Sequence, residues 1–88
     1  MPEKLIVHKL PDYDKGVYRE LAGLAYDTVL KTMVEGTKTH PDDNWQEVDI
    51  IDHLCHASHH IEDYIAKDKT EDHIAHAITR LVMIKFLE

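Results

Sequence analysis

Six of the eight histidines in this 88-residue chain lie in a segment that the sequence uses twice. Residues 52–61 read Asp-His-Leu-Cys-His-Ala-Ser-His-His-Ile, and residues 72–81 read Asp-His-Ile-Ala-His-Ala-Ile-Thr-Arg-Leu. Both contain Asp-His-x-x-His-Ala. Side chains three or four residues apart on a helix are neighbours, so each copy would present a pair of imidazoles to one ion. The repeated block therefore predicts a metal site.

The candidate ligands are the histidines that share one flank of each expected helix: His53, His56, His60, His73 and His76. Imidazole suits zinc or nickel, whereas magnesium and manganese prefer carboxylates. Asp52 and Asp72 directly precede a histidine and point about 100° away from it. We assign them as candidate catalytic carboxylates, or as groups that orient the ligands. The competing interpretation is that histidines beside an apolar stripe are hydrogen-bonded packing residues.

Three helices would position these side chains. The spacing of apolar residues predicts helices over about 13–35, 48–67 and 71–87, and Gly36 is a natural stop for the first. The turn between the second and third helices is short, so these two should form an antiparallel hairpin. No strand-pairing signal is present, and we expect an all-α fold.

The expected architecture is a single three-helix domain over residues 12–88, preceded by an arm at 1–11 that is either extended against the core or disordered. The first helix carries two apolar stripes, more than a surface helix needs. We therefore expect the domain to form a homodimer or higher oligomer, as a larger bundle.

The apolar stripes of the second and third helices should face the core, with the histidine flank beside them. The expected buried residues are Ile50, Ile51, Leu54, Ser58, Ile61 and Ile65 in the second helix, and Ile74, Ala77, Ile78, Leu81 and Ile84 in the third.

Composition limits the partners. Ten Lys and Arg against seventeen Asp and Glu give a net charge of −7 with neutral histidines. So acidic a chain lacks the positive surface that binds nucleic acid or anionic membranes. One cysteine, Cys55, allows no disulfide within the chain and favours the reducing cytoplasm.

Two further segments suggest a family. Residues 35–45 read Glu-Gly-Thr-Lys-Thr-His-Pro-Asp-Asp-Asn-Trp, and residues 72–77 read Asp-His-Ile-Ala-His-Ala. Over residues 35–83 the chain resembles small helical phage and prophage proteins of the dATP/dGTP diphosphohydrolase-like type, which are neighbours of the MazG-like all-α nucleotide pyrophosphatases. The most specific matches are Asn44-Trp45 and the His-x-x-His-Ala segment.

The resemblance implies a metal-dependent enzyme that splits a deoxynucleoside triphosphate into a monophosphate and pyrophosphate. Magnesium or manganese would activate water and offset the triphosphate charge. Arg80 is the natural phosphate contact because its guanidinium is a planar, bidentate donor. Asn44 and Trp45 would complete the substrate site, although a Trp45 that ends a loop is also typical of a core anchor. If phage-encoded, the protein would work in the host cytoplasm.

The alternative function is non-enzymatic. The chain lacks the Glu-x-x-Glu pair with which the MazG-like enzymes hold magnesium. A small acidic helical protein of this kind would bind a host or phage protein, and its histidines would be structural. Metal binding without catalysis would use the same histidines as the enzyme.

Overall fold

The computed structural model describes residues 15–39 and 44–88, in which every regular element is a helix and there is no strand. The elements in chain order are α1 (Lys15–Thr39), the short 3-10 helix η2 (Trp45–Glu47), α2 (Ile50–Ile65) and α3 (His73–Leu87). The expected all-α class with three helices is confirmed. The predicted arm at 1–11 and the predicted start of the first helix near residue 13 lie outside the described residues.

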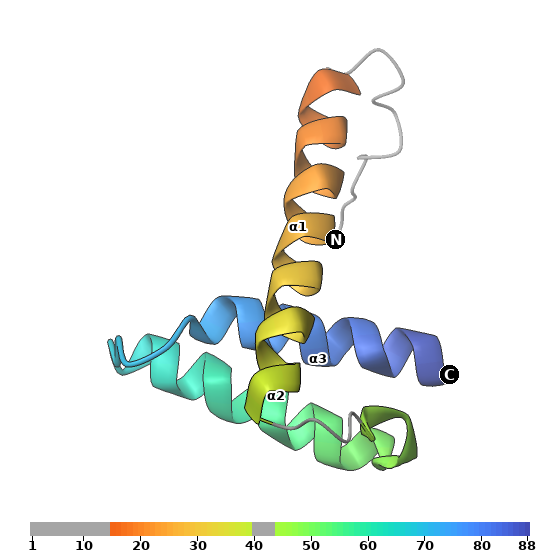
Figure 1. Cartoon of the computed structure of the whole chain (residues 1–88). Helices are drawn as coiled ribbons and strands as arrows, with labels where there is room; N and C mark the ends of the chain where they lie inside the picture. Colours follow the sequence, from red (N-terminus) through yellow and green to blue (C-terminus); the bar gives the residue numbers. More distant parts are fainter. Residues whose placement is uncertain (1–14, 40–43) are drawn as a thin grey trace, which may run out of the picture.

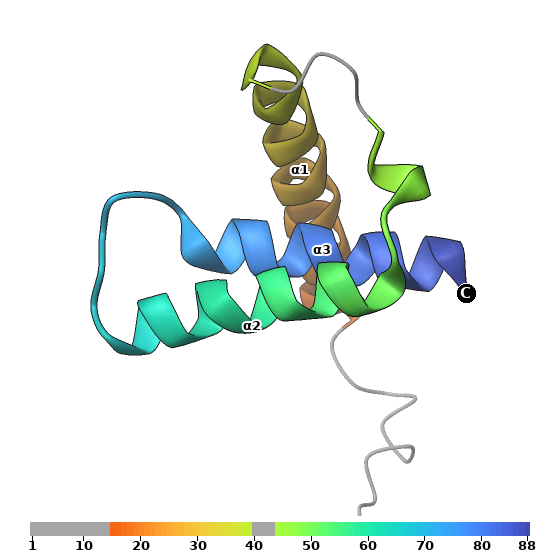
Figure 2. The ribbon, with the colours of Figure 1, turned by 90° about the horizontal axis from the view of Figure 1, so that it is seen from below.

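Helix α3 is the centre of the arrangement, because α1, α2 and η2 all contact it. Helices α2 and α3 lie side by side, and the chain turns back between them (Figures 1 and 2). Helix α1 crosses this pair, and its first half extends away from it (Figure 1). No helix among the described residues is long and apolar enough to cross a membrane.

Helix α1 runs four residues past Glu35, where the sequence predicted its end. Gly36 is not in the left-handed conformation that closes a helix, so it continues the helix. The hydroxyl of Thr39 donates to the Gly36 carbonyl at 3.2 Å, within the last turn.

Helix α2 ends in a Schellman motif, in which a left-handed residue follows the helix. That residue is Lys67, with φ 66°. Its N–H donates to the Tyr64 carbonyl, and the N–H of Asp68 donates to the Asp63 carbonyl, both at 3.0 Å. The motif turns the chain towards α3 and fixes the place of Asp68.

Helix α3 begins at a side-chain cap. The Oδ1 atom of Asp72 accepts a hydrogen bond from the N–H of Ala75 at 3.1 Å. This satisfies one of the unpaired donors of the first turn. Asp68 and Thr70, earlier in the turn, are residue types that can also cap a helix. Asp68 instead accepts a hydrogen bond from the Thr70 hydroxyl at 2.7 Å, within the turn.

The interior of the single chain differs from the expected core. The buried residues of α2 and α3 are small or polar: His53, Ala57, His73, Ala75, Ala77 and Thr79. The face of α2 that was expected to form the core is exposed to solvent in one chain, with Ile51 65% and Ile65 71% exposed. Ala57 and Ala77 leave room for the two helices to approach closely, and the histidine flank fills the contact. The expected burial of the apolar stripe is therefore wrong for one chain.

The left-handed Lys67 gives a stability prediction. A side chain in this conformation costs about 1–2 kcal/mol, whereas glycine adopts it freely but loses more entropy on folding. We expect Lys67→Gly to raise the free energy of unfolding by about 0.5–1 kcal/mol in urea titrations at fixed protein concentration. Lys69→Gly, in the same turn but without positive φ, is the control and should be neutral or destabilising. A destabilising Lys67→Gly would contradict the prediction.

Candidate functional site

His53 is fully buried and joins three elements through its two ring nitrogens. Its Nε2 lies 2.9 Å from the carbonyl oxygen of Trp45 in η2. Its Nδ1 lies 3.0 Å from Nη1 of Arg80 in α3. A carbonyl only accepts and a guanidinium only donates, so Nε2 carries the proton and Nδ1 accepts. His53 is thus a neutral ring with both nitrogens engaged, and neither is open to an ion in this arrangement.

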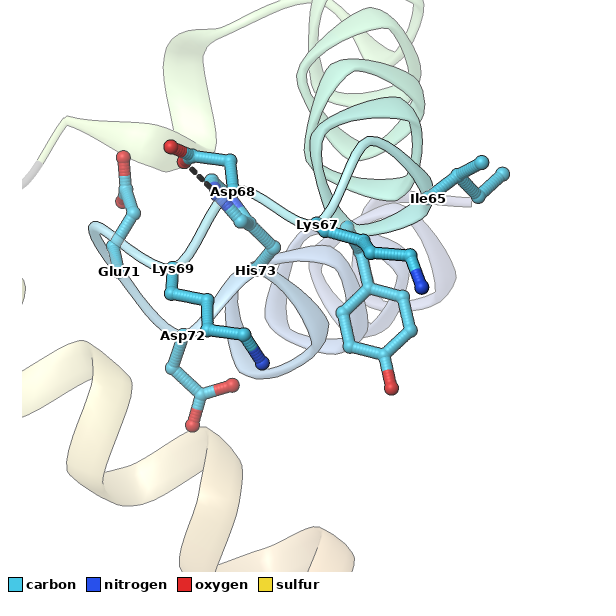
Figure 3. A pocket seen from close by; sticks show the side chains of 8 residues that line it. Ile65, Lys67, Asp68, Lys69, Glu71, Asp72 and His73 are labelled. Atoms are coloured by element: carbon cyan, nitrogen blue, oxygen red, sulfur yellow. Dashed lines mark hydrogen bonds and ion pairs between the residues drawn. The ribbon is translucent and has the colours of Figure 1, made fainter.

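His73 is the buried counterpart at the other end of the helix pair. Its Nε2 lies 2.6 Å from Oδ2 of Asp68, and its Nδ1 lies 2.9 Å from Nδ1 of His60. Hydrogen bonds from Thr70 and His73 hold the pKa of the Asp68 carboxyl below its usual value. Asp68 is therefore an ionised acceptor, and His73 donates its Nε2–H to it (Figure 3).

The contact between His60 and His73 determines the state of the His60 ring. Two lone pairs facing each other would repel, so one Nδ1 must carry a proton. With both rings neutral, the proton of His73 is on Nε2, and His60 is the donor. Burial and then the neighbouring His76 lower the pKa of His60, which favours its neutral form. The lone pair of His60 is then on Nε2.

These two hydrogen bonds are related by the repeat in the sequence. His53 and His73 occupy the second position of their blocks, while His60 and Arg80 occupy the ninth. In each case the second position bonds to the ninth position of the other helix. The repeated block is therefore also a repeated contact, arranged about an approximate two-fold axis.

Two groups of side chains have the composition and spacing to hold a metal ion. The first is His60, Glu71 and His76, and the second is Asp63, Asp68 and His73; within each, the ligand atoms lie within 4.8 Å of one another. In the first group, Nε2 of His76 lies 3.5 Å from Oε1 of Glu71. The rings of His60 and His76 are stacked, with centroids 4.8 Å apart.

A groove of about 700 Å³ lies between the end of α1, η2 and α3. Its functional side chains are Asn44, Trp45, His56, Glu71, His76 and Arg80. Arg80 is half-buried, and burial lowers the pKa of its guanidinium, which remains cationic at neutral pH. The Arg80 charge, followed by burial, lowers the pKa of His56. The groove thus combines one fixed positive charge with two carboxylates, those of Glu35 and Glu71, and with the imidazoles of His56 and His76.

A second cavity of about 520 Å³ lies at the turn between α2 and α3. Figure 3 shows Lys67, Lys69 and Asp72 around it, with Asp68 bonded to His73. Lysines and carboxylates alternate here, so the cavity presents no consistent charge to a ligand.

The structure brings together part of the predicted site. His60 and His76 meet with Glu71, and His56 shares the groove with Arg80, Asn44 and Trp45. The remaining four residues lie elsewhere: His53 and His73 are buried with both nitrogens bonded, Asp52 is exposed in the first turn of α2, and Asp72 caps α3.

Trp45 also acts as an anchor. It is half-buried, and its ring makes an edge contact with Phe86 of α3 at 5.4 Å between centroids. The sequence reasoning left this role open beside the substrate role, and the two are compatible because Trp45 also lines the groove.

Glu71 and Asp68 are the site residues that the sequence reasoning missed. Both lie in the turn, where no helical periodicity applies. Their nearness in the sequence to the candidate ligands could have indicated them, because each precedes a histidine of the repeated block by five residues. A carboxylate in a short turn before a helix is close in space to the first turns of that helix.

Comparison of the chain with known protein families, curated proteins and solved structures finds no match.

The two bonds of His53 predict a large stability effect. His53→Leu keeps the volume but leaves the Trp45 carbonyl and the Arg80 guanidinium without this partner. We expect a loss of about 2–4 kcal/mol in the free energy of unfolding, measured in urea at fixed protein concentration. The matched control is His59→Leu on the exposed side of the same helix, where a change within about 0.5 kcal/mol is expected. Equal effects of the two variants would contradict the role of His53.

Proposed function

We propose that the chain is a nucleotide-binding helical protein of the diphosphohydrolase type, with the groove beside α3 as its site. The observation that carries this proposal is that Arg80, His76 and Glu71 all line this groove. Arg80 follows His76 by four residues, so the two side chains are neighbours on one helix face.

Arg80 is the group of the groove that suits a phosphate chain, whereas Glu35 and Glu71 would need a metal cation between them and the phosphates. Arg80 supplies a permanent positive charge with several N–H donors, one of which goes to His53. Because the whole chain carries −7, a triphosphate would be repelled elsewhere on the surface, and a local cation is needed. The edge of Trp45 and the amide of Asn44 give the same groove an apolar contact and a hydrogen-bonding group for a base or sugar.

A divalent ion that enters with the triphosphate would be held mainly by the phosphates, with the Glu71 carboxylate as a ligand from the groove. When bound, it would offset triphosphate charge and polarise a phosphoryl oxygen. The chain's own contribution to hydrolysis would be to orient the phosphates through Arg80 and to accept a proton from water at the neutral ring of His56. Asp52 and Asp72 do not line the groove, so this proposal gives them no catalytic role.

A separate observation supports a homodimer. Among the described residues, the buried apolar side chains are three alanines, whereas seventeen large apolar residues are exposed. So small an apolar interior does not stabilise a domain of this size. We propose that the apolar faces of α1 and of the α2–α3 hairpin pack against a second copy. A two-fold pair covers the same patch on both chains, and it is the commonest form of association.

The nucleotide site is tested by calorimetric titration with dATP and dGTP in the presence of Mg²⁺. We expect binding that Arg80→Lys weakens by about tenfold or more, because a bidentate, charge-assisted contact is lost. His56→Gln, inside the groove, should also weaken binding, while His59→Gln, outside it, should not.

Absence of binding at millimolar nucleotide would refute the nucleotide proposal. Release of pyrophosphate by the wild-type protein tests the hydrolytic part separately. Binding without release would leave a nucleotide-binding protein that is not an enzyme.

Light scattering tests the dimer. We expect a mass twice the 10.2 kDa of one chain at micromolar concentration. Leu24 is 64% exposed in the single chain, and Leu24→Asp should reduce the mass to that of a monomer. Arg19→Asp, about 140° away around α1, is the control and should leave the mass unchanged. A monomeric wild-type protein would refute the dimer and would leave the apolar faces to a different protein partner.

A further inference from the structure

We propose that His60, Glu71 and His76 form a binding site for a transition-metal ion of the zinc class. Asp68 and His73 orient the His60 ligand of this site through hydrogen bonds. This goes beyond nucleotide binding, because the site needs no nucleotide and its ion is not magnesium. Three features support this site: its donor set, the orientation of His60, and the poorer fit of the neighbouring acidic group.

The donor set is two imidazoles and one carboxylate. This combination is characteristic of zinc sites that keep an open fourth position. The ligand atoms lie within 4.8 Å of one another, against about 3.3 Å in a tetrahedral zinc site. Glu71 can move most readily to shorten these distances, because its long side chain is 48% exposed and comes from the turn before α3.

His60 is oriented by a chain of hydrogen bonds that ends in a carboxylate. Asp68 accepts from His73 at 2.6 Å, and the His73 ring is joined to Nδ1 of His60 at 2.9 Å. In the neutral pair described above, His60 donates its Nδ1–H and keeps a lone pair on Nε2. Metal-binding histidines almost always donate their other ring N–H in this way, which fixes the tautomer and raises ligand basicity. His73 is 2% exposed, so it is a rigid support for His60.

The neighbouring group of Asp63, Asp68 and His73 is a poorer site. Its imidazole would have to use Nε2 of His73, which carries the proton of the short bond to Asp68. Binding an ion there would break that bond. Magnesium is also a poor fit at His60, Glu71 and His76, because it prefers six oxygen ligands and these residues offer one carboxylate.

The proposed zinc site adjoins the groove. Two of the three ligands, Glu71 and His76, also line the groove that contains Arg80. A water molecule or an anion in the groove would therefore complete the coordination, and the same anion would be within the influence of the Arg80 charge.

The test is titration of EDTA-treated full-length protein with Zn²⁺ in the absence of nucleotide, with the visible spectrum of bound Co²⁺ as a second readout. We expect one zinc per chain, bound far more tightly than Mg²⁺, and a tetrahedral Co²⁺ spectrum. Glu71→Gln and His76→Gln should each weaken zinc binding by at least tenfold. Both change half-exposed side chains, so folding should be retained, and either variant alone suffices.

Two further variants separate the supporting residues from the competing site. Asp68→Asn should weaken zinc binding by about 10–100-fold while retaining one zinc per chain, as expected of a positioning residue. Asp63→Asn and His59→Gln should change nothing.

The proposal is overturned if Asp63→Asn removes zinc binding and Glu71→Gln does not. It is also overturned if folded protein binds no zinc at micromolar concentration, or binds Mg²⁺ as tightly. None of these results depends on nucleotide, so failure here is distinguishable from failure of the proposed function.

Discussion

The buried ring of His53 is the contact on which the arrangement of the chain depends. It accepts from Arg80 and donates to the Trp45 carbonyl, so a single side chain fixes η2 and α3 relative to α2. Both partners are strongly directional, and leaving either unpaired in the interior would be costly. The buried alanines let the helices approach closely, but they bury little apolar area. Within one chain, hydrogen-bond geometry and not side-chain bulk determines how the helices meet.

The same bonds prepare the chemistry of the groove. By accepting one N–H of Arg80, His53 anchors the guanidinium at the groove wall. At the other end, His73 fixes the ring of His60 in the same way. A functional group that is already oriented loses less entropy when it binds a ligand, so the buried histidines support binding without touching the ligand. This explains how six histidines in one repeated block can serve different purposes.

Much of the fold follows from the sequence, because the apolar spacing, the short turn and the absence of strand signals all indicate helices. The sequence did not predict which side of each helix faces inward. The apolar stripe of α2 and its histidine flank are adjacent, and a prediction based on hydrophobicity buries the stripe. Whether the stripe is covered depends on what packs against it, which in the proposed dimer would be a second chain. Glu71 and Asp68 were missed for another reason: turn residues have no periodicity that would place them in space.

The approximate two-fold relation between α2 and α3 has a consequence for the origin of the chain. A single copy of the block, pairing with itself in opposite directions, would make the bond between its second and ninth positions twice, once at each end. Two such subunits joined by a loop after tandem duplication would have the present topology. Divergence at one position then suffices to separate the two ends. With Arg80 as the ninth residue, one end would offer a cation to anions, and with His60 as the ninth residue, the other end would offer a nitrogen lone pair to the proposed metal ion.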